Sequence, residues 1–183
     1  MGNVPRFSTA AIALAIALAA PSNRRMADGK RWTTRNLDVA AVPSYCYDNA
    51  EANCRQYGRL YTWESAQRAC RALGHGWRLP TNDEWSRLAK QYGGLLEQSE
   101  EAGKAAYQAL RTGGRSGFDA VLGGGRNVDG QYARLNAHGF YWTASESDPA
   151  HAWLYNFGQG ISAVNRHGDI EKQRAFSVRC VHE

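Results

Sequence analysis

The sequence predicts an α+β fold, and two observations lead to this class. Apolar residues recur with a helical period between about residues 62 and 111, and beyond this point the period stops. Turn markers then separate short strand-like segments, among them Gly123-Gly124-Gly125, Asp129-Gly130 and His138-Gly139. A chain of 183 residues has the usual length of one domain, so we expect the helices and the strands to share one core.

The N-terminus has the pattern of a secretory signal peptide, which we place at residues 1–20. Arg6 precedes an apolar run, Phe7–Ala20, that is too short for a comfortable membrane span and ends in small residues. The alternatives are an uncleaved N-terminal anchor and a true start at Met26, which would remove the signal. After cleavage we expect a flexible lead-in over residues 21–30, no integral membrane span, and a secreted, periplasmic or cell-surface protein.

The formal net charge of +5 is spread along the chain, with acidic residues between the basic ones. No cluster or helical stripe of Lys and Arg is present, so we predict no nucleic-acid partner. The first elements expected after the lead-in are an opening strand over Arg31–Leu37 and a loop with central turn residues over Tyr45–Cys54.

Two main helices follow, and the second has the clearer local signature. For the first, Thr62 can cap the N-terminus, apolar residues recur at helical spacing from Ala66 to Leu73, and Gly74 ends the pattern. The second starts with a capping box at Thr81-Asn82-Asp83-Glu84. Its buried face and its end are predicted to be formed by Trp85, Leu88, Ala89, Tyr92 and Gly93-Gly94. A shorter helical segment is expected from about Glu97 to Arg111.

The four cysteines, Cys46, Cys54, Cys70 and Cys180, form an even set in a chain that carries an export signal, which favours disulfides over free thiols or a zinc site. Three pairings are possible. The short spacing of Cys46 and Cys54 indicates one bridge and leaves Cys70 to meet Cys180. A loop of that second size is worth about 4 to 5 kcal/mol in the chain-entropy description.

The C-terminal stretch, residues 140–180, combines scaffold and surface patterns. Phe140–Thr143 and Ala175–Val181 look like strands built for burial, whereas aromatic and small polar residues are interleaved between them. Tyr and Trp supply contact area at low entropic cost, and Ser and Asn supply adaptable hydrogen bonds, so this mixture favours a binding face. The predicted ligand-binding residues are Ser145, Glu146, Ser147, Asp148, His151, Trp153, Tyr155, Phe157, Gln159, Ser162, Asn165, Arg166, His167 and Asp169.

Many blocks of the sequence, in order, resemble the Fibrobacter succinogenes major paralogous domain family. The blocks are residues 45–47, 53–54, 57–63, 76–81, 84–85, 117–120, 124–126, 139–145 and 176–181, together with Cys70 and Gly130. The resemblance implies a C-type-lectin-like fold, related to formylglycine-generating domains, with two main helices packed on a twisted antiparallel sheet and with long loops. It also implies a ligand face in the C-terminal part of a domain spanning 31–183, and it supports the pairing of Cys70 with Cys180.

The same fold is used by the variable proteins of diversity-generating retroelements, in which a C-terminal segment is rewritten at adenine-bearing codons. The stretch from about 140 to 180 resembles such a region, because scaffold positions alternate with tolerant polar ones. The hypothesis is therefore an exported protein that displays a diversified recognition surface. We expect a protein as its partner, with a glycan as the alternative.

Two chemical alternatives come with the same kinship. A formylglycine-generating enzyme needs a reactive cysteine pair in the C-terminal half, and only Cys180 lies there, so we predict that the protein is not an enzyme and has no catalytic residues. Calcium-dependent carbohydrate binding is weakened by the absence of Glu-Pro-Asn or Gln-Pro-Asp signatures; Ser147-Asp148-Pro149 is a faint echo. The five histidines show no metal-ligand spacing, so we predict no metal and no cofactor.

Overall fold

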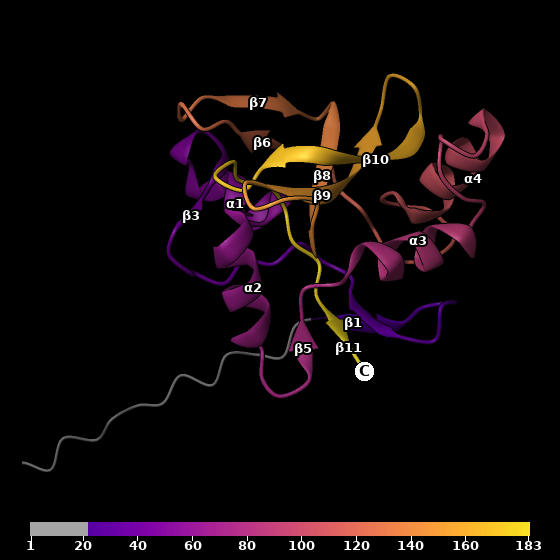
Figure 1. Ribbon diagram of the computed structural model, residues 1–183, viewed down its shortest axis with the longest axis horizontal. Helices are drawn as coiled ribbons and strands as arrows, with labels where there is room; N and C mark the ends of the chain where they lie inside the picture. The colour runs from indigo at the N-terminus through magenta and orange to yellow at the C-terminus, as the bar shows by residue number, and fades with distance from the viewer. Residues whose placement is uncertain (1–21) are drawn as a thin grey trace, which may run out of the picture.

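The structure is a computed structural model that describes residues 22–183, and it has the α+β architecture that the sequence predicts (Figure 1). The predicted signal peptide, residues 1–20, lies outside the described residues. Three sheets occur in the described part of the chain: one of four strands, one of five strands and one of two strands. In Figure 1, α3 and α4 lie to the right of the five-stranded sheet, and α1 and α2 lie below its left-hand part.

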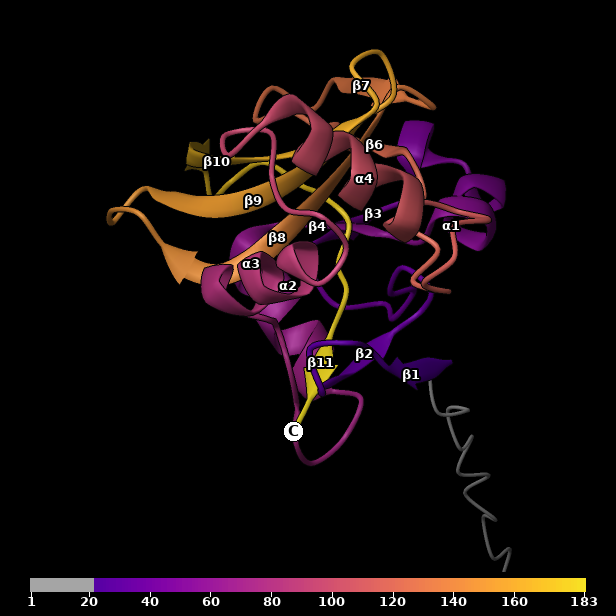
Figure 2. The same cartoon turned by 90° about the vertical axis from the view of Figure 1, so that its right-hand side faces the viewer.

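The four-stranded sheet brings the two ends of the described chain together. Its strand order is β1 (Asn23–Arg25), β2 (Arg31–Thr33), β11 (Val181–His182) and β5 (Trp77–Arg78), all antiparallel (Figure 2). The prediction of a flexible lead-in is wrong for residues 22–30, because β1 and β2 form a hairpin and the side chain of Met26 is buried in the core. The predicted opening strand also ends earlier than expected, at the end of β2.

The five-stranded sheet contains most of the C-terminal stretch. Its order is β10 (Ala163–Glu171), β9 (His151–Gly158), β8 (His138–Glu146), β6 (Gly123–Arg126) and β7 (Tyr132–Leu135). All neighbours are antiparallel except β6 and β8, which pair in parallel. Most of the predicted ligand-binding residues therefore lie on two long paired strands, β9 and β10.

The second main helix, α3 (Asn82–Lys90), begins with the predicted capping box. The Glu84 N–H donates to the Thr81 hydroxyl, and the Thr81 N–H donates to the Glu84 carboxylate at 2.9 Å. The same carboxylate accepts two hydrogen bonds of 2.7 Å from Arg78. Burial acts to raise the pKa of Glu84, but the hydrogen bonds from Arg78 and Thr81 outweigh it and lower the pKa to about 2.

The other helices differ from the expectations in their details. Thr62 is the N-cap residue of α2 (Trp63–Arg71), but its hydroxyl contacts the Ser65 hydroxyl at 3.1 Å and does not accept a capping bond from the backbone. The third predicted helix is α4 (Glu100–Leu110), and it is capped by Ser99, whose hydroxyl accepts from the Ala102 N–H.

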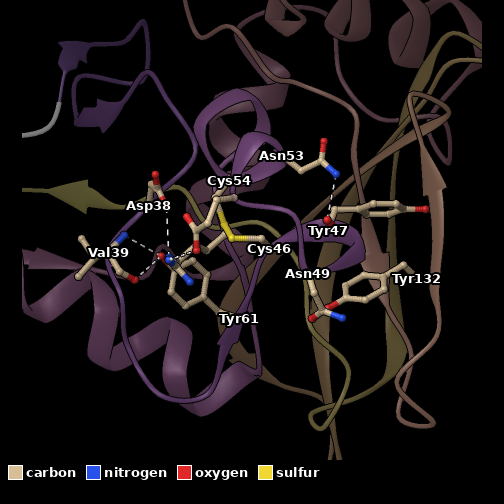
Figure 3. Close-up of a disulfide and its surroundings, with 11 residues drawn as sticks. Asp38, Val39, Cys46, Tyr47, Asn49, Asn53, Cys54, Tyr61 and Tyr132 are labelled. Atoms are coloured by element: carbon tan, nitrogen blue, oxygen red, sulfur yellow. Dashed lines mark hydrogen bonds and ion pairs between the residues drawn. A yellow bond between two sulfur atoms is a disulfide. The ribbon is translucent and has the colours of Figure 1, made fainter.

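The cysteine-tied loop at residues 45–54 contains helical structure that the sequence analysis did not anticipate. A short 3-10 turn, Tyr47–Asn49, leads into α1 (Glu51–Tyr57), and the flanking strands β3 (Ser44–Tyr45) and β4 (Leu60–Tyr61) pair with each other. Figure 3 shows the Cys46–Cys54 bridge within this unit. The bridge joins the middle of α1 to the residue before the 3-10 turn, so the loop is a compact folded unit.

Both predicted disulfides are present, Cys46 with Cys54 and Cys70 with Cys180. No described cysteine is free. The second bridge joins α2 to the residue before β11 and closes a sequence separation of 110 residues. Because it crosses nearly the whole fold, it removes a large amount of conformational freedom from the unfolded chain.

Next to this bridge, Arg179 is fully buried and has no carboxylate among its hydrogen-bond partners. Its guanidinium donates to the Asn36 side chain and to the carbonyl oxygens of Thr33, Phe118 and Asp119. Burial lowers the pKa of Arg179. The side chain joins the N-terminal segment, the loop before β6 and the C-terminal segment, so its role is structural.

Each face of the five-stranded sheet borders a different core. On one face, which we call the helix-covered face, Tyr155 and Phe157 pack with α3 and α4, and Trp85 stacks on Tyr155 with ring centroids 5.2 Å apart. On the opposite face, Leu154 packs with α2 and with the C-terminal segment through Trp142. Because side chains alternate along a strand, every β9 residue belongs to one face or the other.

Candidate functional site

The first group of predicted ligand-binding residues lies at the β8–β9 turn, where it forms a folded loop. The Ser145 hydroxyl accepts a hydrogen bond from the Asn82 N–H at 3.0 Å. Asp148 accepts from the N–H of Ala150 and His151 and lies 2.8 Å from the His151 ring nitrogen. These contacts hold the loop in one conformation, and they occupy polar groups that the prediction had assigned to a partner.

Lys172 ties the same loop to the body of the protein. Its Nζ donates to the carbonyl oxygens of Asp148 and Pro149 at 3.1 and 2.8 Å and lies 3.3 Å from the Glu146 carboxylate. The ammonium group also lies 4.7 Å from the centre of the Trp63 ring. Ser147 completes the connection, because its hydroxyl donates to the carbonyl oxygen of Gly168.

Two predicted ligand contacts require correction. Tyr155 and Phe157 are fully buried on the helix-covered face, so neither side chain is exposed to a partner. The Tyr155 hydroxyl donates to the carbonyl oxygen of Asn82 at 3.0 Å, and burial raises the pKa of Tyr155. The aromatic pattern that suggested a contact surface reflects the core beneath α3 and α4.

Trp153 and Arg166 lie together at the edge of the helix-covered face. The Arg166 guanidinium is 5.0 Å from the centre of the Trp153 ring and forms two short contacts with the Glu97 carboxylate. A side chain at Gly168 would begin only 2.8 Å from the Trp153 ring, so the indole lies directly against the β10 backbone. This cluster joins β9 and β10 to the segment before α4.

The remaining predicted residues divide between a distant turn and one face of β10. Gln159 and Ser162 form the β9–β10 turn, where the Ser162 N–H and hydroxyl both donate to the Gln159 carbonyl oxygen. Asn165 and His167 lie on the face opposite the helix-covered one, and the exposed Asp169 follows them at a register shift in β10. The fourteen predicted residues therefore do not form one surface.

A different set of residues forms a continuous surface, which we call the polar sheet face. Asn165, Asn156 and Phe140 occupy one row across β10, β9 and β8, because each is paired with the next in register. The His138 ring nitrogen lies 3.0 Å from the Asn156 side-chain oxygen, and the His138 ring stacks on Phe140 at a centroid distance of 5.3 Å. The members of the polar sheet face are His138, Phe140, Asn156, Asn165 and His167.

The helices support the sheet that carries the polar sheet face, but they do not cover this face. α3 and α4 pack on the other face, and α2 packs further along the same face, against Trp142 and Leu154. Four of its five members are half-buried, and Asn156 is 7% exposed. The side chains therefore stand on a rigid strand backbone while amide and imidazole groups remain at the surface.

A hollow of about 380 Å³ adjoins the polar sheet face and shares Phe140 with it. We call it the arginine hollow, because Arg134 and Arg174 line it together with Asn127, Phe140 and Phe176. No acidic residue is among its lining residues in the described part of the chain. The hollow and the polar sheet face together combine cationic, amide and aromatic groups.

Sequence reasoning found only Asn165 and His167 of the polar sheet face. It assigned Phe140 to the buried scaffold and treated His138 as a turn residue. One signal could have indicated a strand with two different faces: His138 and Phe140 alternate with Gly139 and Tyr141, which are buried. The pattern alone does not show which of the two faces a helix covers.

The described residues contain one group of potential metal ligands and two bonded cysteine pairs. The one group of three potential metal ligands there is Cys46, Glu51 and Cys54, and its two cysteines are bonded to each other. Cys180 is bonded to Cys70 and so has no thiolate. Among residues 22–183, no helix is both long and apolar enough to cross a membrane.

These features define a class, an α+β domain with two disulfides and a sheet face of polar and aromatic residues. The sequence profile of the Fibrobacter succinogenes major domain matches residues 21–182, so the chain belongs to this family. No curated protein matches the chain, and no solved structure matches it. The family assignment agrees with the resemblance seen in the sequence, and the C-type-lectin-like description of the fold remains a prediction.

Proposed function

We propose that this protein is an exported ligand-binding protein that presents the polar sheet face on a rigid C-type-lectin-like scaffold. The observation that carries the proposal is the row Asn165, Asn156 and Phe140, which aligns amide and aromatic groups across three strands. Such groups suit recognition, because amides donate and accept hydrogen bonds while an aromatic ring supplies apolar contact area. The two disulfides and the aromatic core preorganise this surface, which lowers the entropic cost of binding.

The expected ligand is a protein, and the mechanism is recognition without chemistry. The polar sheet face and the arginine hollow form one broad surface, which favours a macromolecular partner over a small enclosed ligand. A glycan is the alternative ligand, including one bound with calcium. Calorimetry with calcium and with a chelator separates that alternative, because calcium-dependent binding disappears when the ion is removed.

A triple variant of the polar sheet face tests the proposal. We expect His138→Ala, Asn165→Ala and His167→Ala together to abolish capture of partners in a pulldown from extracellular material. The matched control replaces Asp83, Arg87 and Lys90 by Ala, because these are exposed residues of α3 on the other side of the sheet. Equal capture by both triple variants, with both folded, would contradict the proposal.

The proposal includes the hypothesis of diversification by a retroelement. The fold limits it, because Tyr155 and Phe157 of β9 and Val164 of β10 belong to the buried core. We therefore expect the codon differences between a template repeat and this gene to fall at surface positions such as Asn165 and His167 and not at Tyr155 and Phe157. A genomic template repeat of residues 140–183 beside a reverse-transcriptase gene is the required finding, and without one the protein has a fixed binding face.

The proposal also holds that the protein is not an enzyme. A formylglycine-generating activity would need thiolates, and both cysteine pairs are oxidised in this structure. Titration of the folded protein with a thiol reagent is expected to detect no reactive group. Detection of a reactive pair would bring back the enzymatic alternative.

A further inference from the structure

The arginine hollow contains two guanidinium groups without a carboxylate partner. Arg134 is exposed, and its guanidinium has no hydrogen bond or ion pair with any residue in the range 22–183, whereas its carbonyl oxygen accepts from the Ala137 N–H. Arg174 donates to the Asn127 side-chain oxygen at 2.5 Å and lies 5.5 Å from the centre of the Phe176 ring. Neither contact neutralises the charge, so the hollow is a site of positive potential with an aromatic wall.

Several other arginines of this protein do have such a partner. Arg78 contacts Glu84, Arg166 contacts Glu97, and Arg59 contacts Asp38, with N–O distances between 2.7 and 3.2 Å. Each of these three guanidinium groups is partly shielded from water, as is that of Arg174. The fold thus supplies a carboxylate at three comparable sites and supplies none at the arginine hollow.

The backbone that presents Arg134 is in an unusual conformation. Arg134 has a φ of 69°, in the left-handed region that a residue with a side chain seldom occupies. In β6 and β7, the pairs Gly123–Leu135 and Gly125–Ala133 leave Gly124 opposite Arg134, and Gly124 also has a positive φ, of 63°. A local irregularity of this kind redirects a side chain, at a cost of about 1 to 2 kcal/mol for the non-glycine residue. Strained positions of this type concentrate at functional sites.

We propose that the arginine hollow binds the carboxylate of an Asp or Glu side chain that the protein partner inserts beside Phe140. This inference rests on the proposed function and specifies the chemistry of the partner. A guanidinium offers a planar fork of donors that matches a carboxylate, and two of them can surround one anionic group. The Phe140 and Phe176 rings exclude water on one side, which strengthens the attraction.

The size of the hollow is consistent with one side chain as its occupant. A volume of about 380 Å³ is at the lower end of the range for ligand sites and has room for one side chain, and the adjoining polar sheet face provides hydrogen-bonding groups for the backbone around the inserted residue. An acidic side chain that enters the hollow and loses its contact with water has the character of a binding hot spot, because hot spots occupy desolvated pockets. The hollow therefore selects partners that carry a suitable acidic side chain, while the polar sheet face supplies the larger contact area.

The test uses a random heptapeptide library displayed on phage and selected against the full chain at low salt. We expect the recovered peptides to be enriched in Asp and Glu relative to the unselected library. A synthetic selected peptide and its Glu→Gln or Asp→Asn counterpart are then compared by calorimetry, with a loss of affinity on the order of tenfold or more expected for the neutral peptide. Binding of the acidic peptide is also expected to weaken as salt increases.

Protein variants locate the contact. Arg134→Gln and Arg174→Gln are each expected to lower the affinity for the acidic peptide by about tenfold or more. Arg134→Lys is expected to restore part of this affinity, because lysine keeps the positive charge but lacks the planar donor fork of the guanidinium. Arg87→Gln, on exposed α3, is the matched control and should bind normally. Each variant is first checked for an unchanged melting temperature, so that a loss of affinity is not a loss of folding.

The outcomes separate this inference from the proposed function. In one outcome, the recovered peptides lack acidic residues and still fail to bind the polar-sheet-face triple variant. This result would overturn the inference that the arginine hollow binds a carboxylate and would leave the proposed function standing. Acidic peptides that bind Arg134→Gln and Arg174→Gln normally would overturn it as well. Recovered peptides that bind the polar-sheet-face triple variant and both arginine variants as tightly as they bind the native protein would contradict the proposed function itself.

Discussion

The two faces of the five-stranded sheet are built by the same strands, and they differ in what lies against them. On β9, Tyr155 and Phe157 are completely buried beneath α3 and α4, whereas Asn156 between them points to the opposite face. The difference comes from strand alternation together with the docking of two helices on one side. Neighbouring residues in this segment therefore lie on opposite faces, and under the proposed function one face serves stability and the other recognition.

The largest loss of stability is expected from a substitution on the helix-covered face. Replacing Phe157 by Ala should lower the free energy of unfolding by about 3 to 5 kcal/mol, because it removes a buried ring that contacts Tyr141 and Tyr107. Urea denaturation measures the loss. Phe157→Leu keeps most of the volume and should cost less than about 1.5 kcal/mol. A Phe157→Ala protein of normal stability that had lost its partner would show that the two faces were assigned the wrong way round.

A pH effect is expected from α3, which covers the same face. The pKa of Glu84 falls from 4.5 to about 2 on folding, so its contribution is present above pH 4.5 and is lost as the pH falls towards 2. The shift corresponds to about 3 kcal/mol. Glu84→Gln should therefore be less stable than the native protein at pH 7, with the gap closing as the pH is lowered. Equal pH dependence of the two proteins in denaturation curves would show that Glu84 is not the titrating group.

A smaller effect is expected where β10 meets the edge of the helix-covered face. Gly168→Ala would place a methyl group about 2.8 Å from the Trp153 ring, so the indole that contacts Arg166 must shift. Overpacking of this kind typically costs about 1 to 3 kcal/mol. Gly160→Ala in the β9–β10 turn is the control, because no atom lies within 4 Å of the added carbon. Tryptophan fluorescence and denaturation together should separate the two variants.

The smallest effect on stability is expected on the polar sheet face. Asn165→Ala and His167→Ala remove half-buried side chains outside both cores, so each should change the free energy of unfolding by less than about 0.5 kcal/mol. Binding measurements on the same proteins complete the comparison. A large loss of stability at either residue would indicate that this face is structural as well.

Local patterns in the sequence predicted the local structure well. The capping box at Thr81 and Glu84, the helical spacing in α2 and the two disulfides are confirmed, because each depends on residues close in sequence or on a cysteine set with few possible pairings. The hairpin containing Met26 was missed, since its strands are stabilised by β11 from the other end of the chain. The helical turn between Cys46 and Cys54 was missed because turn residues dominate its composition.

The candidate site depended more strongly on tertiary structure. The sequence by itself determined that the C-terminal stretch mixes aromatic and polar residues, that the fold is α+β, and that the chain resembles the family to which it belongs. Only the tertiary structure decided that Tyr155 is core and Asn165 is surface, and that Arg134 and Arg174 line one hollow together with Phe140. The physical reason is that alternation assigns residues to two faces, while the choice of the buried face depends on where distant helices pack.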